Sequence, residues 1–384
     1  MRIVAAVYSH PEYYPPTLNA LNLFAKRFDS ITVLARNVKR QEYAFPKNVH
    51  LRLAGKYKSI EAAQNENIIW KVWSFLSFSL TFYRILLREK PDWVICYDPI
   101  PLLSFKLIGY LLIKKPKLWY HNHDVLQLKD TRSLSISRWA VKSEQRYFEK
   151  IDIFSLPAME RKVAFPMDKF KGTFFFIPNY PSLSNAVYHP KLSLKNKSVI
   201  KFIFQGSIGY NHGLEEIISL IPELNLTFGK EFKLVLKGFV SKEYRDYIFQ
   251  FAVDYGVVDC LSIIGVGPYQ EVFEISSSCD IGIGIHRTED LMNRTLGTSS
   301  NKIYEYAAVG LPVLLFDNMH FKQHLANRKW AYFTDLTETS LKNCINSIML
   351  NYEESSKSAL TDFKKELNFE FVFNNTLDYI ISKS

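Results

Sequence analysis

Short apolar runs alternate with longer stretches of helical periodicity along most of the chain. Strands in parallel sheets give such runs, because helices cover both faces of the sheet. The alternation therefore predicts an α/β protein built on doubly wound parallel sheets. We expect strands at residues 2–8, 31–35, 51–54, 91–98, 117–121, 200–205, 232–237, 261–264, 280–285 and 313–316.

The strand–helix alternation is interrupted once, by a stretch rich in Pro, Ser, Asn and Lys. A chain of 384 residues is also long for a single core, so two domains are expected. We place a first Rossmann-like domain at 1–180, a linker at 181–199 and a second, nucleotide-binding Rossmann-like domain at 200–365. A final helix is predicted within 366–384.

The predicted helix at 68–87 is unusually apolar, since Lys71 and Arg84 are its only charged residues. Its length matches a bilayer span. Serine and charge interrupt it, and a span would break the strand alternation, so a transmembrane helix is the least favoured interpretation. A buried core helix and a helix that exposes aromatic residues at a membrane surface both remain. Residues 102–117 form a second apolar stretch, which ends in basic residues.

Positive charge is concentrated in the first half of the chain. Residues 1–190 carry 28 basic and 15 acidic side chains, whereas residues 191–384 carry 20 and 23. Such asymmetry indicates an anionic partner for the first half. No nucleic-acid-binding motif is present, so we expect an anionic membrane surface, contacted through residues 68–87 and 102–117, and no nucleic acid.

The cysteines and the first residues bear on the compartment. Cys96, Cys260, Cys279 and Cys344 are scattered, without the spacing of a metal site, and three of them lie in apolar runs. Buried thiols in a reducing compartment are therefore favoured over disulfides. Met1 leads directly into a predicted strand rather than a signal peptide, so we expect a cytoplasmic protein, peripheral on the inner face of the cell membrane.

Residues 294–318 combine a loop of small residues, a short helix and a buried strand. Ser299 or Ser300 is expected to cap the helix. A helix N-terminus that follows such a loop favours phosphate, because its N–H groups and its dipole both attract anions. Lys302 and Glu305 lie one helical turn apart, and the same residues fit an exposed structural ion pair equally well.

The segment NK-x-x-EY-x-x-x-G-x-P at 301–312 resembles that of retaining GT-B glycosyltransferases of family 4, a group that includes bacterial cell-surface polysaccharide enzymes. Other segments are similar in the same order along the chain. These are His123 and Asp124 at a strand end, the Ile-Pro-Asn tripeptide at 177–179 and the glycine-containing loop at 205–213.

The resemblance implies a GT-B fold, in which two Rossmann-like domains flank a donor/acceptor cleft and the C-terminal helix crosses back to the first domain. It implies a hexosyltransferase-type enzyme that moves a sugar, with retention and without metal or other cofactor, from a nucleotide diphosphate sugar. The acceptor would be a saccharide or lipid-linked saccharide in cell-surface polysaccharide assembly.

The resemblance also assigns roles to residues. His123 and Asp124 are the expected catalytic residues, although a loop histidine bonded to the backbone is the structural alternative for His123. Glu305 is expected to bind the ribose hydroxyls. The full set of expected donor-binding residues is Gly206, Ser207, His212, Gly213, Gly267, Arg287, Arg294, Ser299, Ser300, Asn301, Lys302 and Glu305.

The chain departs from the family pattern in two places within the second domain. Ser207 and His212 stand where many members carry a cation for the diphosphate, and Gly297 stands where a second glutamate precedes Glu305 by eight residues. The charge must then come from a protonated His212 or from Arg287, Arg294 or Lys302. Two alternatives stay open, a GT-B sugar-nucleotide epimerase and a non-enzymatic binding protein of the same fold.

Overall fold

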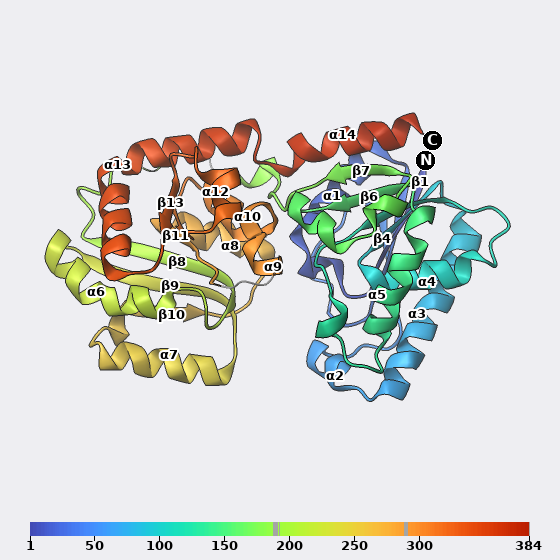
Figure 1. The fold of residues 1–384 in the computed structure, drawn as a ribbon, viewed down its shortest axis with the longest axis horizontal. Helices are drawn as coiled ribbons and strands as arrows, with labels where there is room; N and C mark the ends of the chain where they lie inside the picture. Colours follow the sequence, from blue (N-terminus) through green and yellow to red (C-terminus); the bar gives the residue numbers. More distant parts are fainter. Residues whose placement is uncertain (187–190, 192, 288–290, 384) are drawn as a thin grey trace. The chain divides into compact units, whose positions relative to one another are not determined.

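The computed structural model describes residues 1–186, 191, 193–287 and 291–383. The chain divides into two compact units, Met1–Pro178 with Val372–Ser384, and Asn179–Phe371 (Figure 1). Each unit contains one parallel sheet, in agreement with the predicted fold class. The predicted linker at 181–199 includes residues 187–190 and 192, which lie outside the described residues.

The first unit has seven strands in the order β3-β2-β1-β4-β5-β6-β7. The strands are β1 (Arg2–Val7), β2 (Ser30–Arg36), β3 (Val49–Ala54), β4 (Trp93–Tyr97), β5 (Lys117–His121), β6 (Ile153–Leu156) and β7 (Thr173–Phe176). The helices are α1 (Pro15–Arg27), α2 (Ile60–Asn65), α3 (Ile68–Glu89), α4 (Pro99–Gly109) and α5 (Ile136–Tyr147), joined from Val372 onward by α14 (Phe369–Ser382). Phe373 of α14 packs against Phe24 and Trp119, with ring centroids 5.4 Å and 5.8 Å away.

The second unit has six strands in the order β10-β9-β8-β11-β12-β13. The strands are β8 (Val199–Ile208), β9 (Glu231–Val240), β10 (Leu261–Ile264), β11 (Ile281–Gly284), β12 (Val313–Phe316) and β13 (Ala331–Thr334). The helices are α6 (Leu214–Phe228), α7 (Lys242–Asp254), α8 (Tyr269–Ser277), α9 (Leu291–Arg294), α10 (Leu296–Ser299), α11 (Asn301–Ala308), α12 (Met319–Leu325) and α13 (Glu338–Lys365). Short 3-10 turns lie at Pro11–Tyr13, Leu128–Asp130, Phe148–Lys150, Met159–Ala164, Met167–Lys169, Leu183–Asn185 and Val258–Cys260.

The strand order reverses once in each sheet, between β1 and β4 in the first unit and between β8 and β11 in the second. Helices that leave the two neighbouring strands at such a point turn to opposite faces of the sheet. Ligands of doubly wound sheets bind there, beyond the carboxyl ends of the strands. The topology therefore fixes where a site is to be sought in each unit.

The ten predicted strands are all present, and the described part of the chain contains three additional short ones. β6, β7 and β13 have four residues each, too few for a periodicity to stand out from the flanking sequence. β8 and β9 also run further than predicted, to Ile208 and Val240. The four cysteines are free thiols.

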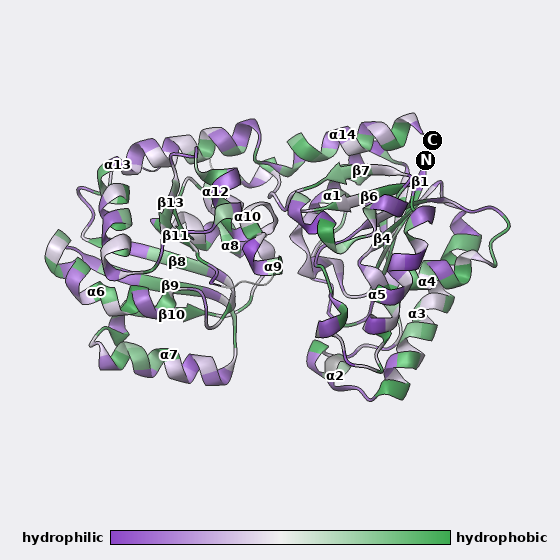
Figure 2. Ribbon diagram, viewed as in Figure 1, coloured by the Kyte–Doolittle hydropathy of each residue, from purple (hydrophilic) through white to green (hydrophobic). Residues whose placement is uncertain are grey.

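Helix α3 has apolar residues on both its inner and its outer side (Figure 2). Phe75, Phe78, Phe82 and Leu86 form a stripe buried in the unit. The alternative of a buried core helix holds for this stripe only, because large apolar residues outside it are exposed, namely Ile68, Ile69, Trp70, Val72, Trp73, Leu76, Leu80 and Leu87. Among the described residues, no helix is long and apolar enough to cross a membrane.

A buried carboxyl group lies inside the first unit, on α5. The Tyr120 hydroxyl donates a hydrogen bond to the Glu144 carboxyl group, and Asn122 Nδ2 donates to the same hydroxyl over 2.9 Å. Burial raises the pKa of Glu144 from 4.5 to about 8, with a smaller contribution from Asp98 in the same direction. The folded protein therefore keeps a proton that the unfolded chain releases between these two pH values.

Stability should consequently fall as pH rises through this window, by at most about 1.4 kcal/mol per pH unit. Glu144→Gln keeps an acceptor for Tyr120 and removes the titration. The difference in melting temperature between this variant and the wild type should therefore increase in favour of the variant as the pH is raised from about 5 to about 8. The exposed Glu149→Gln is the control and should show no such trend; a flat difference for Glu144→Gln would contradict the assignment.

Candidate functional site

The reversal point of the second sheet is built for a close approach of backbone. Gly206, inside β8, and Gly213, directly before α6, have φ of 121° and 69°, in the region that favours glycine. On the neighbouring strand, a Cβ atom at Gly238 would lie 2.0 Å from the Gly206 carbonyl oxygen. The loop that the sequence predicted to hold phosphate therefore depends on glycine at each of these positions.

Glu305, on α11, is a buried carboxylate with 4% of its surface exposed. The Tyr269 hydroxyl donates to its Oε1 over 2.9 Å, and Gln205 Nε2 donates to its Oε2. Ser276 Oγ in turn donates to Gln205 Oε1 over 2.8 Å, which orients the amide. Burial raises the pKa of Glu305 to about 7, although the hydrogen bonds and Lys302 oppose the shift.

Lys302 is the second residue of the same helix, α11. Its Nζ is 4.0 Å from the centroid of the Phe204 ring and 3.2 Å from His286 Nε2. Burial lowers the pKa of this amine to about 7, and the Glu305 carboxylate raises it in part. The alternative of an exposed Lys302–Glu305 surface pair is therefore wrong, because both groups lie among buried partners.

His212 is a neutral side chain at this site. Burial first, and the neighbouring Lys302 second, lower its pKa to about 4. Its Nδ1 is 3.2 Å from the carbonyl oxygen of Ile285, which can only accept, so Nδ1 carries the proton. The expectation that a protonated His212 supplies charge is not supported, and Lys302 is the cation that the fold brings beside Gly206.

The remaining predicted cations and loop residues are more peripheral. Arg287 is exposed and pairs with Glu216 of α6 over 2.7 Å, and Arg294 is exposed at the end of α9. Ser207 is exposed and extends β8. At Gly267 a Cβ atom would lie 2.1 Å from the Glu271 carboxylate, a contact that the flexible end of this side chain can relieve by moving.

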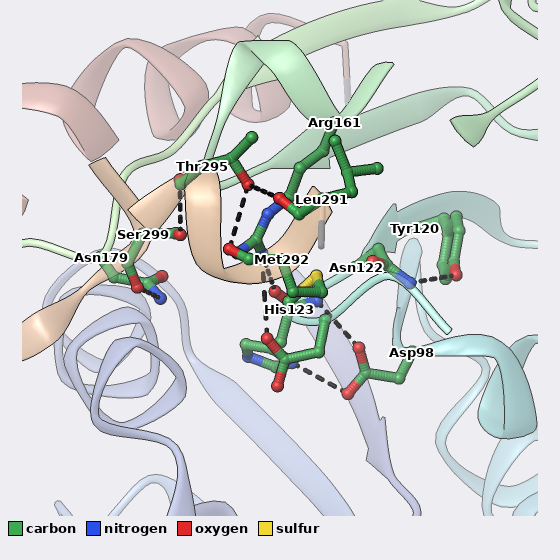
Figure 3. Close-up of polar contacts among 11 residues, drawn as sticks. Asp98, Tyr120, Asn122, His123, Arg161, Asn179, Leu291, Met292, Thr295 and Ser299 are labelled. Atoms are coloured by element: carbon green, nitrogen blue, oxygen red, sulfur yellow. Dashed lines mark hydrogen bonds and ion pairs between the residues drawn. The ribbon is translucent and has the colours of Figure 1, made fainter. Parts of the chain in front are cut away.

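The start of α11 differs from the sequence expectation. Ser300 occupies the N-cap position, but its side chain makes no capping hydrogen bond, and Ser299 Oγ donates instead to the carbonyl of Thr295 over 3.0 Å (Figure 3). Asn301 Oδ1 is buried and has no hydrogen-bond partner among the described residues. The N–H groups of the first helical turn, which have no partner within the helix, are therefore not covered by the Ser300 hydroxyl.

In the first unit, His123 is held on all sides beyond the end of β5. Its main-chain N–H donates to Asp98 Oδ1 over 2.8 Å, and its Nδ1 is 3.0 Å from Asp98 Oδ2 (Figure 3). Its Nε2 is 3.0 Å from Thr17 Oγ1, and its ring stacks between Tyr14 and Tyr97 with centroids 4.7 Å and 5.1 Å away. The alternative of a loop histidine bonded to the backbone is wrong for this ring, because side chains occupy both nitrogens.

The segment around His123 is anchored by further polar groups. Asp98 adopts φ of 70° directly after β4, an uncommon conformation that its contacts to His123 stabilise. Arg161, fully buried, donates from Nη1 to the His123 carbonyl over 2.7 Å and lies 3.8 Å from Asp124 Oδ1. Asp124 itself points outward, with 75% of its side chain exposed.

Several residues of the two sites were not expected from the sequence. Gln205 and His286 directly follow the apolar runs of β8 and β11, so their place at strand ends was a usable signal. Lys237 ends such a run on β9 and is buried in an ion pair with Glu271 at 2.7 Å. Thr17, Arg161 and Tyr269 carried no such signal. Among the described residues, no group of three or more His, Cys, Asp or Glu is arranged to hold a metal ion.

Solved structures resemble the chain over its whole length. Sucrose-phosphate synthase from Thermosynechococcus elongatus matches with a TM-score of 0.71 at 11% identity, covering 100% of both chains. Anabaena HepE, in complex with UDP and glucose, matches with 0.67 at 12% identity and the same coverage. A putative UDP-N-acetylglucosamine 2-epimerase from Listeria monocytogenes matches with 0.62 at 11% identity, covering 100% of this chain and 96% of the other.

These matches show the GT-B fold, which the sequence had predicted. No protein-family model and no curated protein sequence matches the chain. At 11–12% identity the structural likeness establishes the fold and not the reaction.

The Asp98–His123 pair can be tested by exchanging one atom. A carboxylate only accepts hydrogen bonds, so Nδ1 of His123 must carry the proton that it shares with Asp98. In Asp98→Asn the new side chain is compatible with the positive φ. Its NH2 group must face either Nδ1 of His123 or the main-chain N–H of His123, so one of the two hydrogen bonds loses its acceptor. We expect a loss of about 1–3 kcal/mol in urea unfolding.

Nitrogen-15 spectra of the imidazole should show at the same time that the proton of His123 has moved from Nδ1 to Nε2. The exposed Asp378→Asn, on α14 of the same unit, is the control and should change stability by less than about 0.5 kcal/mol. A loss in the control as large as in Asp98→Asn would contradict the assigned geometry.

Proposed function

We propose that the chain is a metal-independent, retaining glycosyltransferase of the hexosyltransferase type, which uses a nucleotide diphosphate sugar. The single observation that supports this most is the pair formed by buried Glu305 and half-buried Lys302 at the reversal point of the second sheet. The two groups form no ion pair with each other and lie beside a loop that depends on glycine. The carboxylate can therefore bind the ribose end of a nucleoside diphosphate, and the amine its phosphate end. The resemblance of 301–312 to family 4 enzymes supports the same assignment.

Glu305 is proposed to bind the ribose. Each of its oxygens already accepts one hydrogen bond, from Tyr269 and Gln205, and a carboxylate has lone pairs for further donors. The two hydroxyl groups of a ribose are such donors, and the fixed carboxylate would bind them without reorganisation. Bound UDP in the HepE structure is consistent with a nucleotide site on this fold.

The diphosphate is proposed to lie between Lys302 and the first turn of α11. In the transfer, the bond between C1 of the sugar and the diphosphate oxygen breaks, and C1 bonds to the acceptor hydroxyl oxygen. The acceptor proton passes to the departing phosphate, so that no separate base is needed. Lys302, the α11 N–H groups and the other proposed donor-binding residues stabilise the charge that develops on the leaving group. His123 and Asp124 are the proposed catalytic residues of the first unit.

The acceptor is proposed to be a saccharide or lipid-linked saccharide of cell-surface polysaccharide assembly, reached at the inner face of the membrane. The support is the apolar outer side of α3, which exposes Trp70 and Trp73, together with basic residues near the end of 102–117. Aromatic residues flanked by lysines suit the interface between water and an anionic bilayer. This places the protein in the cytoplasm as a peripheral membrane protein.

An epimerase is the second candidate, because a putative epimerase shares the fold. It would convert a nucleotide sugar without any acceptor. A non-enzymatic binding protein is the third candidate, because the loop cation is missing and Gly297 stands in place of a second glutamate. Such a protein would gain thermal stability when the donor is added but would release no nucleotide. Product analysis with and without membrane extract separates the three candidates.

Donor binding is tested by thermal unfolding with a panel of UDP, GDP, ADP, dTDP and CMP sugars. One nucleotide sugar should stabilise the wild type by about 2.7 kcal/mol at a hundredfold excess over Kd. Glu305→Gln should weaken this ligand at least about tenfold, because the neutral amide accepts ribose hydroxyls less strongly. Glu144→Gln, which changes a buried carboxyl group in the other unit, should bind the donor as the wild type does. Equal affinity of Glu305→Gln and wild type would refute the ribose assignment.

The pH dependence of donor affinity should be bell-shaped and centred near pH 7. Lys302, with a pKa of about 7, loses its charge above this pH, and Glu305, with a pKa of about 7, loses its charge below it. The diphosphate diester of the donor does not titrate in this range. In calorimetry, Lys302→Gln should bind the donor more weakly, and its affinity should no longer decline at alkaline pH. Glu305→Gln should also bind more weakly, and its affinity should no longer decline at acid pH. Wild-type affinity that is constant across this range would contradict both roles.

A further inference from the structure

A cavity of about 550 Å³ opens in the first unit at the amino ends of strands β4 and β5, whereas His123 lies beyond the carboxyl end of β5. It is lined by the end of α3, by the segment Lys90–Trp93 that enters β4, by Leu112–Lys117 that enters β5 and by Lys383. Strands of a parallel sheet begin on one edge and end on the other, and His123 and Asp98 lie beyond the ends. The cavity is therefore separate from the candidate site.

The cavity combines an apolar interior with a basic rim. Leu86, Trp93 and Leu112 are buried side chains of its lining, and Leu87 and Ile113 are exposed ones. The charged residues of the lining are five lysines and one aspartate: Lys90, Lys114, Lys115, Lys117, Lys383 and Asp92. A volume in the range of about 300–1,000 Å³ is typical of small-molecule sites.

The positive charge of the rim is not neutralised within the described part of the chain. None of its lysines forms an ion pair with another described residue. Lys117 donates instead to the main-chain carbonyl of Lys383 and lies 5.5 Å from the Trp93 ring centroid. The Asp92 carboxylate accepts from the main-chain N–H of Arg2 over 2.9 Å. Unpaired cations around an apolar space fit an anionic group that carries a hydrocarbon tail.

The cavity also continues the exposed apolar side of α3. Leu87 belongs to both, since it lines the cavity and is among the exposed residues of that helix. Tyr110 and Leu111, which precede the second lining segment, are exposed as well. Residues that would contact a bilayer thus lead directly to the lysine rim.

We propose that this cavity binds one anionic phospholipid, with the phosphate against the lysines and the start of an acyl chain against Leu86, Trp93 and Leu112. The proposal rests on the membrane contact proposed above and specifies which lipid retains the protein there. A lysine near an anionic lipid contributes about fivefold to affinity. The lipid is an anchor at the edge remote from the candidate site and not the acceptor.

The test uses a lipid that is soluble as a monomer, because a surface patch needs a bilayer whereas a cavity does not. Calorimetry should show saturable one-to-one binding of dihexanoylphosphatidylglycerol to the full chain below its micelle concentration. Dihexanoylphosphatidylcholine should bind at least about tenfold more weakly, since it has no net charge to pair with the lysines. Glycerol 3-phosphate, which has no tail, should also bind more weakly. Equal binding of all three, or no binding of the anionic lipid, would overturn the proposal.

Paired variants separate the cavity from the outer side of α3. Lys114→Gln with Lys115→Gln should weaken the monomeric anionic lipid about 25-fold, whereas Trp70→Ser with Trp73→Ser should leave it unchanged and reduce only sedimentation with phosphatidylglycerol vesicles. The exposed lysines Lys56 and Lys129, both changed to Gln, are the charge-matched control and should keep lipid affinity. A control loss equal to that of the rim variant would refute a specific site.

The same preparations report on the proposed function independently. Donor-dependent thermal stabilisation should be unchanged in the Lys114→Gln, Lys115→Gln variant, because these residues belong to the other unit. Donor binding without lipid binding would overturn the cavity proposal alone. Lipid binding without donor binding would overturn the glycosyltransferase proposal and leave the cavity in place.

Discussion

The candidate donor site depends on the burial of two opposite charges that do not pair with each other. Glu305 takes its hydrogen bonds from Tyr269 and Gln205, and Lys302 lies against Phe204 and His286, although the two residues share one face of α11. Burial brings the pKa of each group to about 7, so neither is firmly ionised. An arrangement that costs stability in the free protein, and that an anion with hydroxyl groups would relieve, is typical of a binding site rather than of a structural core.

The first unit meets a related requirement by a different means. Asp98 holds a backbone conformation with positive φ at the end of β4, and its two oxygens accept from the main chain and the ring of His123. The buried Arg161 then fixes the His123 carbonyl. The strained backbone at the end of β4 is thus offset by hydrogen bonds to His123 at the end of β5. These hydrogen bonds also fix the orientation of the imidazole, which could still rotate in its plane if it were held only by packing between two tyrosines.

The sequence allowed the strands, the two sheets and the helix at 301–308 to be predicted, because these depend on local periodicity and on small residues at known spacings. It did not predict the partners of the key side chains. Gln205 and Glu305 are 100 residues apart in sequence, and their contact exists only because β8 and α11 meet at the reversal point. The neutral state of His212 and the missing Ser300 cap likewise depend on burial and local geometry, which a motif does not contain.

Helix α3 explains why composition alone left three interpretations open. Its buried phenylalanine stripe packs into the core and explains the apolar residues on one side of the helix. The exposed Trp70, Trp73 and Leu80 add nothing to that core and would promote aggregation in water if nothing covered them. The same outer side leads to a cavity ringed by lysines that form no ion pair with a described residue, whereas the second half of the chain has no excess of positive charge. Apolar exposure and basic charge therefore coincide on one unit, as expected if that unit, and not the donor-binding one, meets an anionic bilayer.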